Sequence, residues 1–481
     1  MKPIITLILF LFYFSSTCES SKCVKQTFTP ESILTGITHT RFKRDTPKLE
    51  EIVCTNVTAN LDLDIAYEVK PYRQELWIRD SSIPKIPANS SLSRFTHIQT
   101  LRIIGVGLEQ IEPGAFDKLT QLKELNLNVN NLTKISKGVL NNLPTLDTLN
   151  LAVNQISEIE EGSFQGLDNL TTLNIYENKI TSFGENAFSD LKSLDNLWIS
   201  HNPLTEFAPS EFPNLKSIIA IKTELKTLDI DFTKSPLDHL KLTQGKLEKI
   251  DFAKFPSMTM LQLEKNLISS VKNWDKLDCR RVFLHHNKIT SFDISENVVD
   301  LYLEFNQITK ITNTFVGRNK KLKNLYLNGN KISEVTSDVL KGLVELQHLN
   351  LNNNEIAVLK KGTFVNTPIL RKLDVAHNKI AAIEVDAFKG LINFEELDIS
   401  DNDLVKLESP VLSELKKANV IVGNTDIEWQ YVVTLVLNSD DLSLQLDQTF
   451  WNCESTEPGY VPKYITKHNV NNTMCSFKKK Q

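Results

Sequence analysis

The chain has 481 residues, a hydrophobic fraction of 41% and a formal net charge of −5. This small charge, with no basic patch interleaved with aromatic residues, argues against a nucleic-acid partner. The sequence contains no H-E-x-x-H, no G-x-S-x-G and no glycine-rich phosphate loop, so we expect neither an enzyme nor a cofactor.

Residues 1–20 have the pattern of a secretory signal peptide. Lys2 gives a charged start, an apolar run extends from Ile4 to Phe14, and small residues then offer cleavage after Cys18 or Ser20. The run is too short to span a bilayer, and no later apolar segment is long enough. We therefore expect a secreted, extracellular protein without a membrane anchor.

Residues 21–75 and 423–481 match no repeat, and we interpret them as caps, the second with a tail, on either side of a repetitive middle. The simplest pairing of their cysteines is one disulfide in each cap, as suits an oxidising compartment, although sequence does not determine connectivity. These cysteines are Cys23 and Cys54 before the repeats and Cys453 and Cys475 after them. Five N-x-S/T sequons fit a glycosylated product, and they begin at Asn56, Asn89, Asn131, Asn169 and Asn471.

A basic segment in the N-terminal cap resembles a secretory processing site. It reads R-F-K-R at residues 41–44 and lies in a threonine-rich, poorly patterned stretch. Cleavage after Arg44 would release residues 21–44 unless a bond between Cys23 and Cys54 tethers them. A solvated basic loop is the alternative, and N-terminal sequencing of the secreted product would separate the two.

A short apolar pattern recurs through the middle of the chain. In one copy Leu349 and Leu351 are two residues apart and share one face of a short strand, and Asn354 follows where the chain must turn. The same position, which we call the ladder position, is held by Asn130, Asn154, Asn178, Asn202, Thr223, Gly245, Asn266, Asn287, Asn306, Asn330, Asn354, Asn378 and Asn402, and in weaker form by Val106 and Ser81. One such turn cannot bury its own apolar face, so we predict about fifteen stacked coils.

The spacing of the coils is uneven. It is 24 residues at both ends of the array and 19 to 22 residues in the middle. The longer coils carry a phenylalanine spine that we expect beneath short helical turns, formed by Phe116, Phe164, Phe188, Phe212, Phe364 and Phe388. The short coils lack this signal, so we expect tighter connections there.

The pattern L-x-x-L-x-L-x-x-N-x-L with its phenylalanine spine resembles the extracellular form of the leucine-rich repeat family, from Leu76 to Leu415. The resemblance implies an α/β fold, a leucine-rich repeat solenoid over residues 76–422 with a parallel sheet on its concave face. Disulfide-bearing caps would then cover residues 21–75 and 423–481.

Function is expected on the concave sheet, where outward side chains of successive strands stack about 4.8 Å apart. The phase of the leucines places two apolar groups there. The first is Phe283, Tyr302 and Tyr326 with Phe305 at its edge, and the second is Tyr176, Trp198, Ile219 and Ile221. Exposed aromatic clusters favour protein contact, whereas the alternative is that these rings only stabilise neighbouring strands.

Charged residues on the same face suggest further sites. Glu264, His285 and Glu304 place an imidazole between two carboxylates, and we predict that the acids favour the charged imidazolium in a pH-sensitive partner contact. A solvated row of charges, or a metal site with His286, is the alternative. Asp398, Asp401 and Asp403 make an acidic C-terminal end, where a calcium site is an alternative although the spacing fits no calcium loop. Cys279 takes a leucine position, so it is a buried thiol or, alternatively, an intermolecular disulfide.

The predicted function is that of a secreted, non-enzymatic protein whose concave face binds a protein partner. The chain is similar to insect leucine-rich immune proteins of the haemolymph, which pair with complement-like proteins. Residues 423–481 show no heptad pattern, so the similarity is to coil-less members, and this departure counts against a disulfide-linked heterodimer. Dimerisation stays open. The alternatives are an extracellular adhesion or developmental ligand-binding protein and a secreted enzyme inhibitor.

Overall fold

A computed structural model of the chain describes residues 22–28, 49–57, 75–183, 186–207, 214–312, 319–415, 418–423, 425, 443–445, 460–465 and 474–479. The predicted signal peptide, the basic segment at 41–44, Cys453 and Asn471 lie outside these residues. The chain forms two compact units, one of residues 1–155 and 163–167, the other of residues 156–162 and 168–481. Within the described residues, no helix is both long and apolar enough to cross a membrane.

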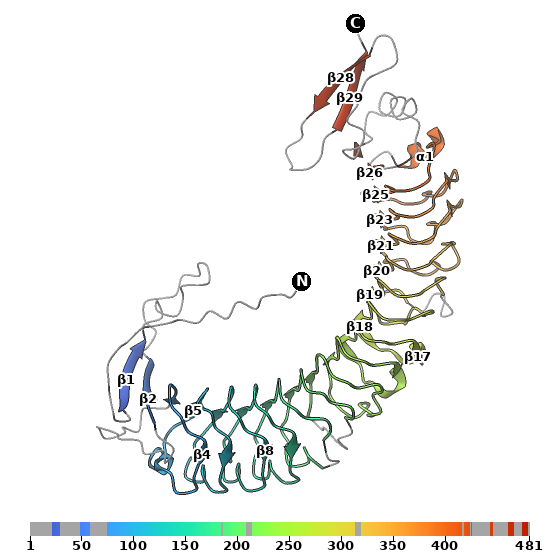
Figure 1. The fold of residues 1–481 in the computed structure, drawn as a ribbon. Coiled ribbons are helices and arrows are strands. Elements are labelled where there is room, and N and C mark those ends of the chain that lie inside the picture. The colour runs from blue at the N-terminus through green and yellow to red at the C-terminus, as the bar shows by residue number, and fades with distance from the viewer. Residues whose placement is uncertain are drawn as a thin grey trace. The chain divides into compact units, whose positions relative to one another are not determined.

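The first unit is a row of short parallel strands (Figure 1). Its pairing runs from β2 (Leu49–Thr55) through β3 (Glu75–Ile78), β5 (Thr100–Ile103) and β7 (Glu124–Asn126) to β9 (Thr148–Asn150). β1 (Lys22–Phe28) is antiparallel to β2 and sets Cys23 opposite Cys54. The other elements are β4 (Lys85–Ile86), which pairs with β6 (Gln110–Ile111), the 3-10 turn η2 (Ser91–Arg94) and β8 (Lys134–Ile135).

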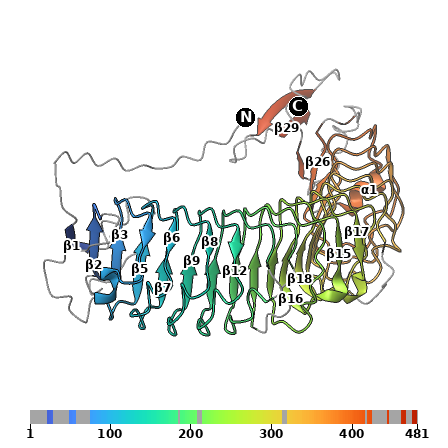
Figure 2. The same ribbon diagram turned by 60° about the horizontal axis from the view of Figure 1, so that its bottom comes forward.

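The second unit repeats the arrangement, and its coils stack one upon the next in Figure 2. The parallel strands that pair in sequence are β11 (Thr172–Asn174), β12 (Asn196–Trp198), β13 (Ser217–Ile219), β14 (His239–Lys241), β16 (Met258–Gln262), β18 (Cys279–Phe283), β19 (Asp300–Tyr302), β20 (Asn324–Tyr326), β21 (His348–Asn350), β23 (Lys372–Asp374), β25 (Glu396–Asp398), β26 (Asn419–Ile421) and β27 (Ser443–Gln445). β27 lies in the predicted C-terminal cap and continues this sheet.

Short elements complete the second unit. They are β10 (Glu158–Ile159), the pairs β15 (Lys249–Asp251) with β17 (Ser270–Lys272) and β22 (Val358–Leu359) with β24 (Ala382–Ile383), the 3-10 turns η3 (Phe252–Lys254) and η4 (Trp274–Lys276), the helix α1 (Ser409–Glu414), and the antiparallel pair β28 (Tyr460–Ile465) with β29 (Met474–Lys479). The predicted parallel solenoid is therefore confirmed, but hydrogen-bonded turns stand where short helical turns were expected, and α1 is the one α-helix in the described residues.

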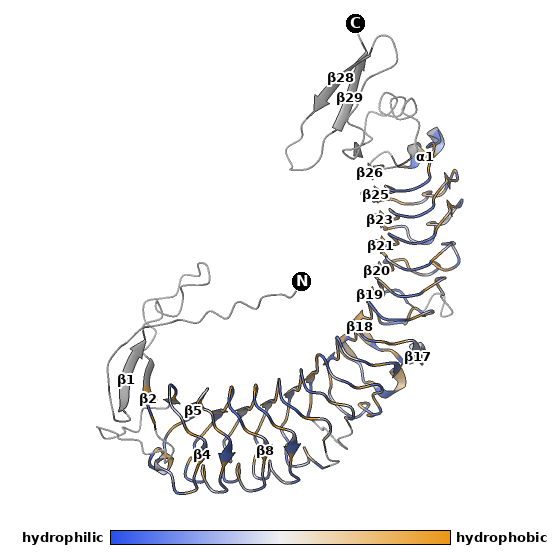
Figure 3. Cartoon of the chain, viewed as in Figure 1, coloured by the Kyte–Doolittle hydropathy of each residue, from blue (hydrophilic) through white to orange (hydrophobic). Residues whose placement is uncertain are grey.

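Burial follows the leucine phase, so hydrophobic and hydrophilic segments alternate along each coil (Figure 3). Leu349 and Leu351 are buried, as are the described phenylalanines of the spine. The short middle coils lack the regular phenylalanine signal but still have an aromatic core, because Phe232, Phe252 and Phe292 are buried there. They sit at other distances from the ladder position, where a single offset could not detect them.

The ladder position links each coil to its predecessor. Asn354 Nδ2 donates to the carbonyl oxygens of Leu351 (2.9 Å) and, one coil back, of Leu327 (3.0 Å), while its Oδ1 accepts from the amide of Ile332 (2.9 Å). In the first coil the hydroxyl of Ser81 takes the acceptor role by accepting from the amide of Val57. This confirms the weak ladder position that the sequence indicated at Ser81.

The residue before each ladder position has a left-handed backbone. In twelve coils φ lies between 51° and 58° on a residue other than glycine, including His286, Phe305 and the β-branched Val129. Such a conformation costs roughly 1 kcal/mol or more for these residues. Where the ladder residue is asparagine, its side chain helps to offset this cost, since Asn130 Nδ2 also donates to the carbonyl of Asn128 inside the same turn.

Cys279 is buried and unpaired, which confirms the assignment to the core. Burial raises the pKa of its thiol to about 12, so at neutral pH the group is a protonated and unreactive hydrophobe. The intermolecular disulfide that the sequence left open would require this side chain to leave the core.

Replacing Asn354 with Ala is expected to lower the free energy of unfolding by about 3 kcal/mol, because it leaves buried carbonyl and amide groups of two coils without partners. Urea denaturation of both variants measures the change. Asn352→Ala is the control and should lose less than about 1 kcal/mol, since Asn352 Nδ2 reaches only Asp374 at 3.4 Å. Equal losses in the two variants would contradict the role given to the ladder.

Candidate functional site

Parallel register brings three of the predicted rings together on the sheet face, the solvent side of the strands. Phe283, Tyr302 and Tyr326 lie opposite one another on β18, β19 and β20. The ring centroids are 4.4 Å apart for Phe283–Tyr302 and 4.7 Å for Tyr302–Tyr326, with 8° between the planes of each pair. We call these three rings the aromatic stack. Their faces cover one another, so the ring edges are left for a partner.

A second pair of rings lies a few residues further along the same coils. His286 and Phe305 stack at 4.5 Å with 8° between their planes, and Phe305 is 46% exposed. In the next coil the same position is Gly329, where an added Cβ would lie 2.6 Å from Cδ1 of Phe305. Only glycine leaves room for that ring. We call His286 and Phe305 the outer pair. The sequence prediction had Phe305 alone, although the residue before each ladder position was a readable signal.

Between the aromatic stack and the outer pair runs a line of three polar side chains, Glu264, His285 and Glu304, which we call the Glu–His–Glu row. Each is half-buried, and each has a buried polar atom without a hydrogen-bond partner: Glu264 Oε2, His285 Nδ1 and Glu304 Oε2. Such groups are uncommon because an unpaired buried polar atom loses its hydration without compensation.

The predicted imidazolium is wrong. Burial, with smaller contributions from His286 and Lys265, lowers the pKa of His285 to about 4. Burial also raises the pKa of Glu304 to about 7. It raises the pKa of Glu264 as well, although Lys241 and Lys265 act to lower that pKa. Desolvation is the largest cause of all three shifts, so His285 is neutral at pH 7.

The second predicted apolar group also lies on the sheet face of the second unit. Trp198 is 39% exposed on β12, and β13 places Ile219 opposite it. Ile221 and Tyr176 are half-buried, and the ring of Tyr176 meets His201 edge-on at 4.9 Å. The group is therefore more loosely built than the aromatic stack.

The alternative metal sites do not form. Among the described residues, no group of three or more His, Cys, Asp or Glu side chains could hold a metal ion. At the acidic end Asp398 accepts from the amide of Ser400 at 3.0 Å, and Asp401 lies 3.4 Å from His377. These carboxylates therefore serve local contacts.

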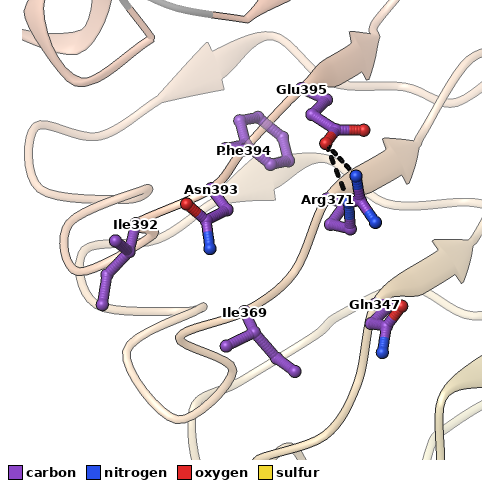
Figure 4. A pocket seen from close by; sticks show the side chains of 7 residues that line it. All are labelled: Gln347, Ile369, Arg371, Ile392, Asn393, Phe394 and Glu395. Atoms are coloured by element: carbon purple, nitrogen blue, oxygen red, sulfur yellow. Dashed lines mark hydrogen bonds and ion pairs between the residues drawn. The ribbon is translucent and has the colours of Figure 1, made fainter.

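A hollow of about 590 Å³ lies where the chain enters β21, β23 and β25 (Figure 4). It is lined by Gln347, Ile369, Arg371, Ile392, Asn393, Phe394 and Glu395. Arg371 Nε donates to Glu395 Oε1 at 2.8 Å, and Ile392 is 74% exposed. Its charged groups are already paired, so it offers less chemistry than the Glu–His–Glu row.

A family model described as leucine rich repeat matches residues 96–156, 144–204, 296–356, 346–404 and 368–417. The chain is a leucine-rich repeat protein. The unmatched residues 205–295 include most of the short coils. No curated protein matches the chain.

Solved structures share the fold of this leucine-rich repeat protein. A Leptospira interrogans leucine-rich repeat protein is 21% identical, covering 73% of this chain and 91% of its own, with a TM-score of 0.52. A chain of the Drosophila Toll–Spatzle complex is 18% identical, and the match covers 81% of this chain and 59% of that chain with a TM-score of 0.61. The LRIM1/APL1C complex gives 17% identity, 83% and 70% coverage, and a TM-score of 0.50.

Glu304→Gln is expected to stabilise the fold at pH 8 and to have little effect at pH 5. Folding raises the pKa of Glu304 from 4.5 to about 7, so its contribution to stability is present below pH 4.5 and is lost as the pH rises to 7. Glutamine avoids the cost of ionising a half-buried carboxyl. We expect the free energy of unfolding at pH 8 to rise by roughly 1–2 kcal/mol, a figure reduced for partial solvent exposure.

Urea denaturation of both proteins at the two pH values measures this effect. Glu355→Gln is the matched control, because Glu355 is exposed and pairs with Lys379 at 3.1 Å, and its effect should stay within about 0.5 kcal/mol. A Glu304→Gln variant that is less stable than the natural protein at pH 8 would show that the carboxylate is satisfied rather than strained.

Proposed function

We propose that this leucine-rich repeat protein is secreted, is not an enzyme, and binds a protein partner in innate immunity through the sheet face of its second unit. The observation that carries the proposal is the aromatic stack with the outer pair beside it. Two ordered sets of rings on neighbouring positions form a rigid, partly apolar surface, and aromatic residues dominate the energetics of protein interfaces.

The positions of the sequons support the same surface. The asparagines at 56, 89, 131 and 169 are all exposed, and the next sequon in the chain begins only at Asn471. The coils that carry both apolar groups therefore contain no glycan acceptor after Asn169. A partner could approach their sheet face without meeting an N-linked sugar from these coils.

The relatives in complexes are consistent with binding as the general role. Toll is seen in a complex with Spatzle, described as a hub in development and innate immunity, and LRIM1 is seen with APL1C. At these identities the likeness concerns the fold alone. The immune assignment rests on the similarity of the repeats to insect leucine-rich immune proteins. An extracellular adhesion or developmental ligand-binding role is the second candidate, since the same sheet face would serve it.

Replacing Phe283, Tyr302 and Tyr326 together with Asn is expected to abolish capture of the partner from native extracellular fluid. Asparagine is the natural residue at this position in other coils. There the Oδ1 atoms of Asn150 and Asn350 each accept a hydrogen bond of 3.0 Å from the backbone amide two residues later. The strands should therefore keep their geometry, and the melting temperature should fall by only a few degrees. Pull-down with mass spectrometry measures capture.

The matched control changes Asp374 and Asp398 to Asn on the same face. Each carboxylate accepts a hydrogen bond from the backbone amide two residues later, and an asparagine side chain can accept the same bond. Capture of the partner should therefore remain at the level of the natural protein. Full capture by the triple variant would show that the stack only stabilises neighbouring strands.

Secretion has its own test. Expressed in a eukaryotic secretory host, the protein should reach the medium with glycans at Asn56, Asn89, Asn131 and Asn169, because these side chains are accessible. Peptide N-glycosidase treatment followed by peptide mapping should convert the four to Asp. Retention of unmodified protein inside the cells would contradict a secretory role.

A further inference from the structure

The Glu–His–Glu row is built differently from the other acidic positions of the sheet face. Asp374 is also half-buried with a raised pKa, yet its carboxylate accepts from the amide of Ala376 at 3.1 Å and from Asn352 at 3.4 Å. Glu264 and Glu304 each keep one buried oxygen with no partner. The row thus holds hydrogen-bonding capacity that the fold itself does not use.

The two sets of rings border this unused capacity. In the coils of His285 and Glu304 the aromatic stack supplies the preceding outward residue, and His286 and Phe305 of the outer pair follow directly. The imidazole nitrogen of His285 and the carboxyl oxygen of Glu304 are therefore presented between rings, while Glu264 in the neighbouring coil lies between Gln262 and Lys265. A group that fits here is flat, cationic and rich in donors.

We propose that the Glu–His–Glu row receives an arginine side chain of the protein partner, with its guanidinium donating to Glu304 and lying against the neighbouring rings. This inference rests on the proposed function, and it specifies the chemistry of the partner. Guanidinium matches carboxylates with a planar fork of donors and is weakly hydrated, and the aliphatic stem of arginine can pack against the ring edges, whereas lysine is a strongly hydrated point charge.

The charges around the row single out Glu304 as the main acceptor. Lys241 and Lys265 act on the carboxyl of Glu264, but no cation offsets the burial of Glu304 within the described residues. The titratable and charged groups that act on the row and the aromatic stack are Lys241, Lys265, Arg281, His286, Asp300, Tyr302 and Tyr326. An incoming guanidinium would supply the positive charge that Glu304 lacks.

Binding of this kind has a proton balance. The guanidinium pairs with the ionised carboxylate, so Glu304 must give up its proton to solvent. Since its pKa is about 7, roughly half a proton per complex should be released at pH 7. Below pH 7 affinity should fall about tenfold per pH unit, until the pKa of Glu304 in the complex is reached.

The test uses the full secreted chain and three acetylated, amidated tripeptides, Ala-Arg-Ala, Ala-Lys-Ala and Ala-citrulline-Ala. Citrulline keeps the shape of arginine without its charge. The ring signals of His285 in a ¹³C-histidine-labelled sample, assigned with His285→Gln, report binding by nuclear magnetic resonance. The arginine peptide should shift these signals saturably, lysine should bind at least fivefold more weakly, and citrulline should not bind.

Glu304→Gln should lower the affinity for the arginine peptide at least tenfold and remove the proton release. Calorimetry in two buffers of different ionisation enthalpy measures both quantities. Asp374→Asn is the matched control and should change neither. Equal binding of arginine and citrulline, or unchanged binding to Glu304→Gln, would overturn the proposal.

Partner capture separates this inference from the proposed function. If Glu304→Gln captures the partner as well as the natural protein while the triple asparagine variant captures none, the arginine proposal fails and the proposed function stands. If the triple variant also captures the partner fully, the proposed function fails.

Discussion

The hydrogen bonds of the ladder asparagines are the interaction on which the other features of this protein depend. Each side chain closes its own turn and bonds the preceding coil, as Asn354 does toward Leu327 and Ile332. The residue before each ladder asparagine is left-handed, and the bonds of the asparagine close the turn that contains it. These bonds help to offset the cost of a backbone that favours glycine at residues such as His286 and Phe305.

The candidate site is a consequence of this stacking. Equivalent positions recur at the separation of parallel strands, which is close to the separation of stacked aromatic rings. Three coils with an aromatic residue at one position therefore form an ordered stack with planes only 8° apart. The same alignment gathers three half-buried polar side chains into a line. Packing thus orders both sets, so stabilising the strands and meeting a partner are compatible roles.

Features that depend on phase could be predicted from the sequence, and features that depend on burial could not. The leucine pattern placed Phe283, Tyr302 and Tyr326 on one face, because alternation along a strand fixes direction. The charge states of His285 and Glu304 could not be predicted, since sequence spacing gives the neighbours of a group but not the water removed around it. The buried Phe252 and the ring of Phe305 over Gly329 were likewise missed, because each depends on the path of a turn.

The central claim is that the sheet face around β18 and β19 is the functional surface. Hydrogen–deuterium exchange of the full chain, alone and saturated with its captured partner, tests this most directly. We predict slower exchange on binding for the amides of His286 and Phe305, which the partner would cover, and no change around the hollow lined by Ile369 and Ile392. Slower exchange confined to residues 369–395, with residues 283–305 unchanged, would contradict it.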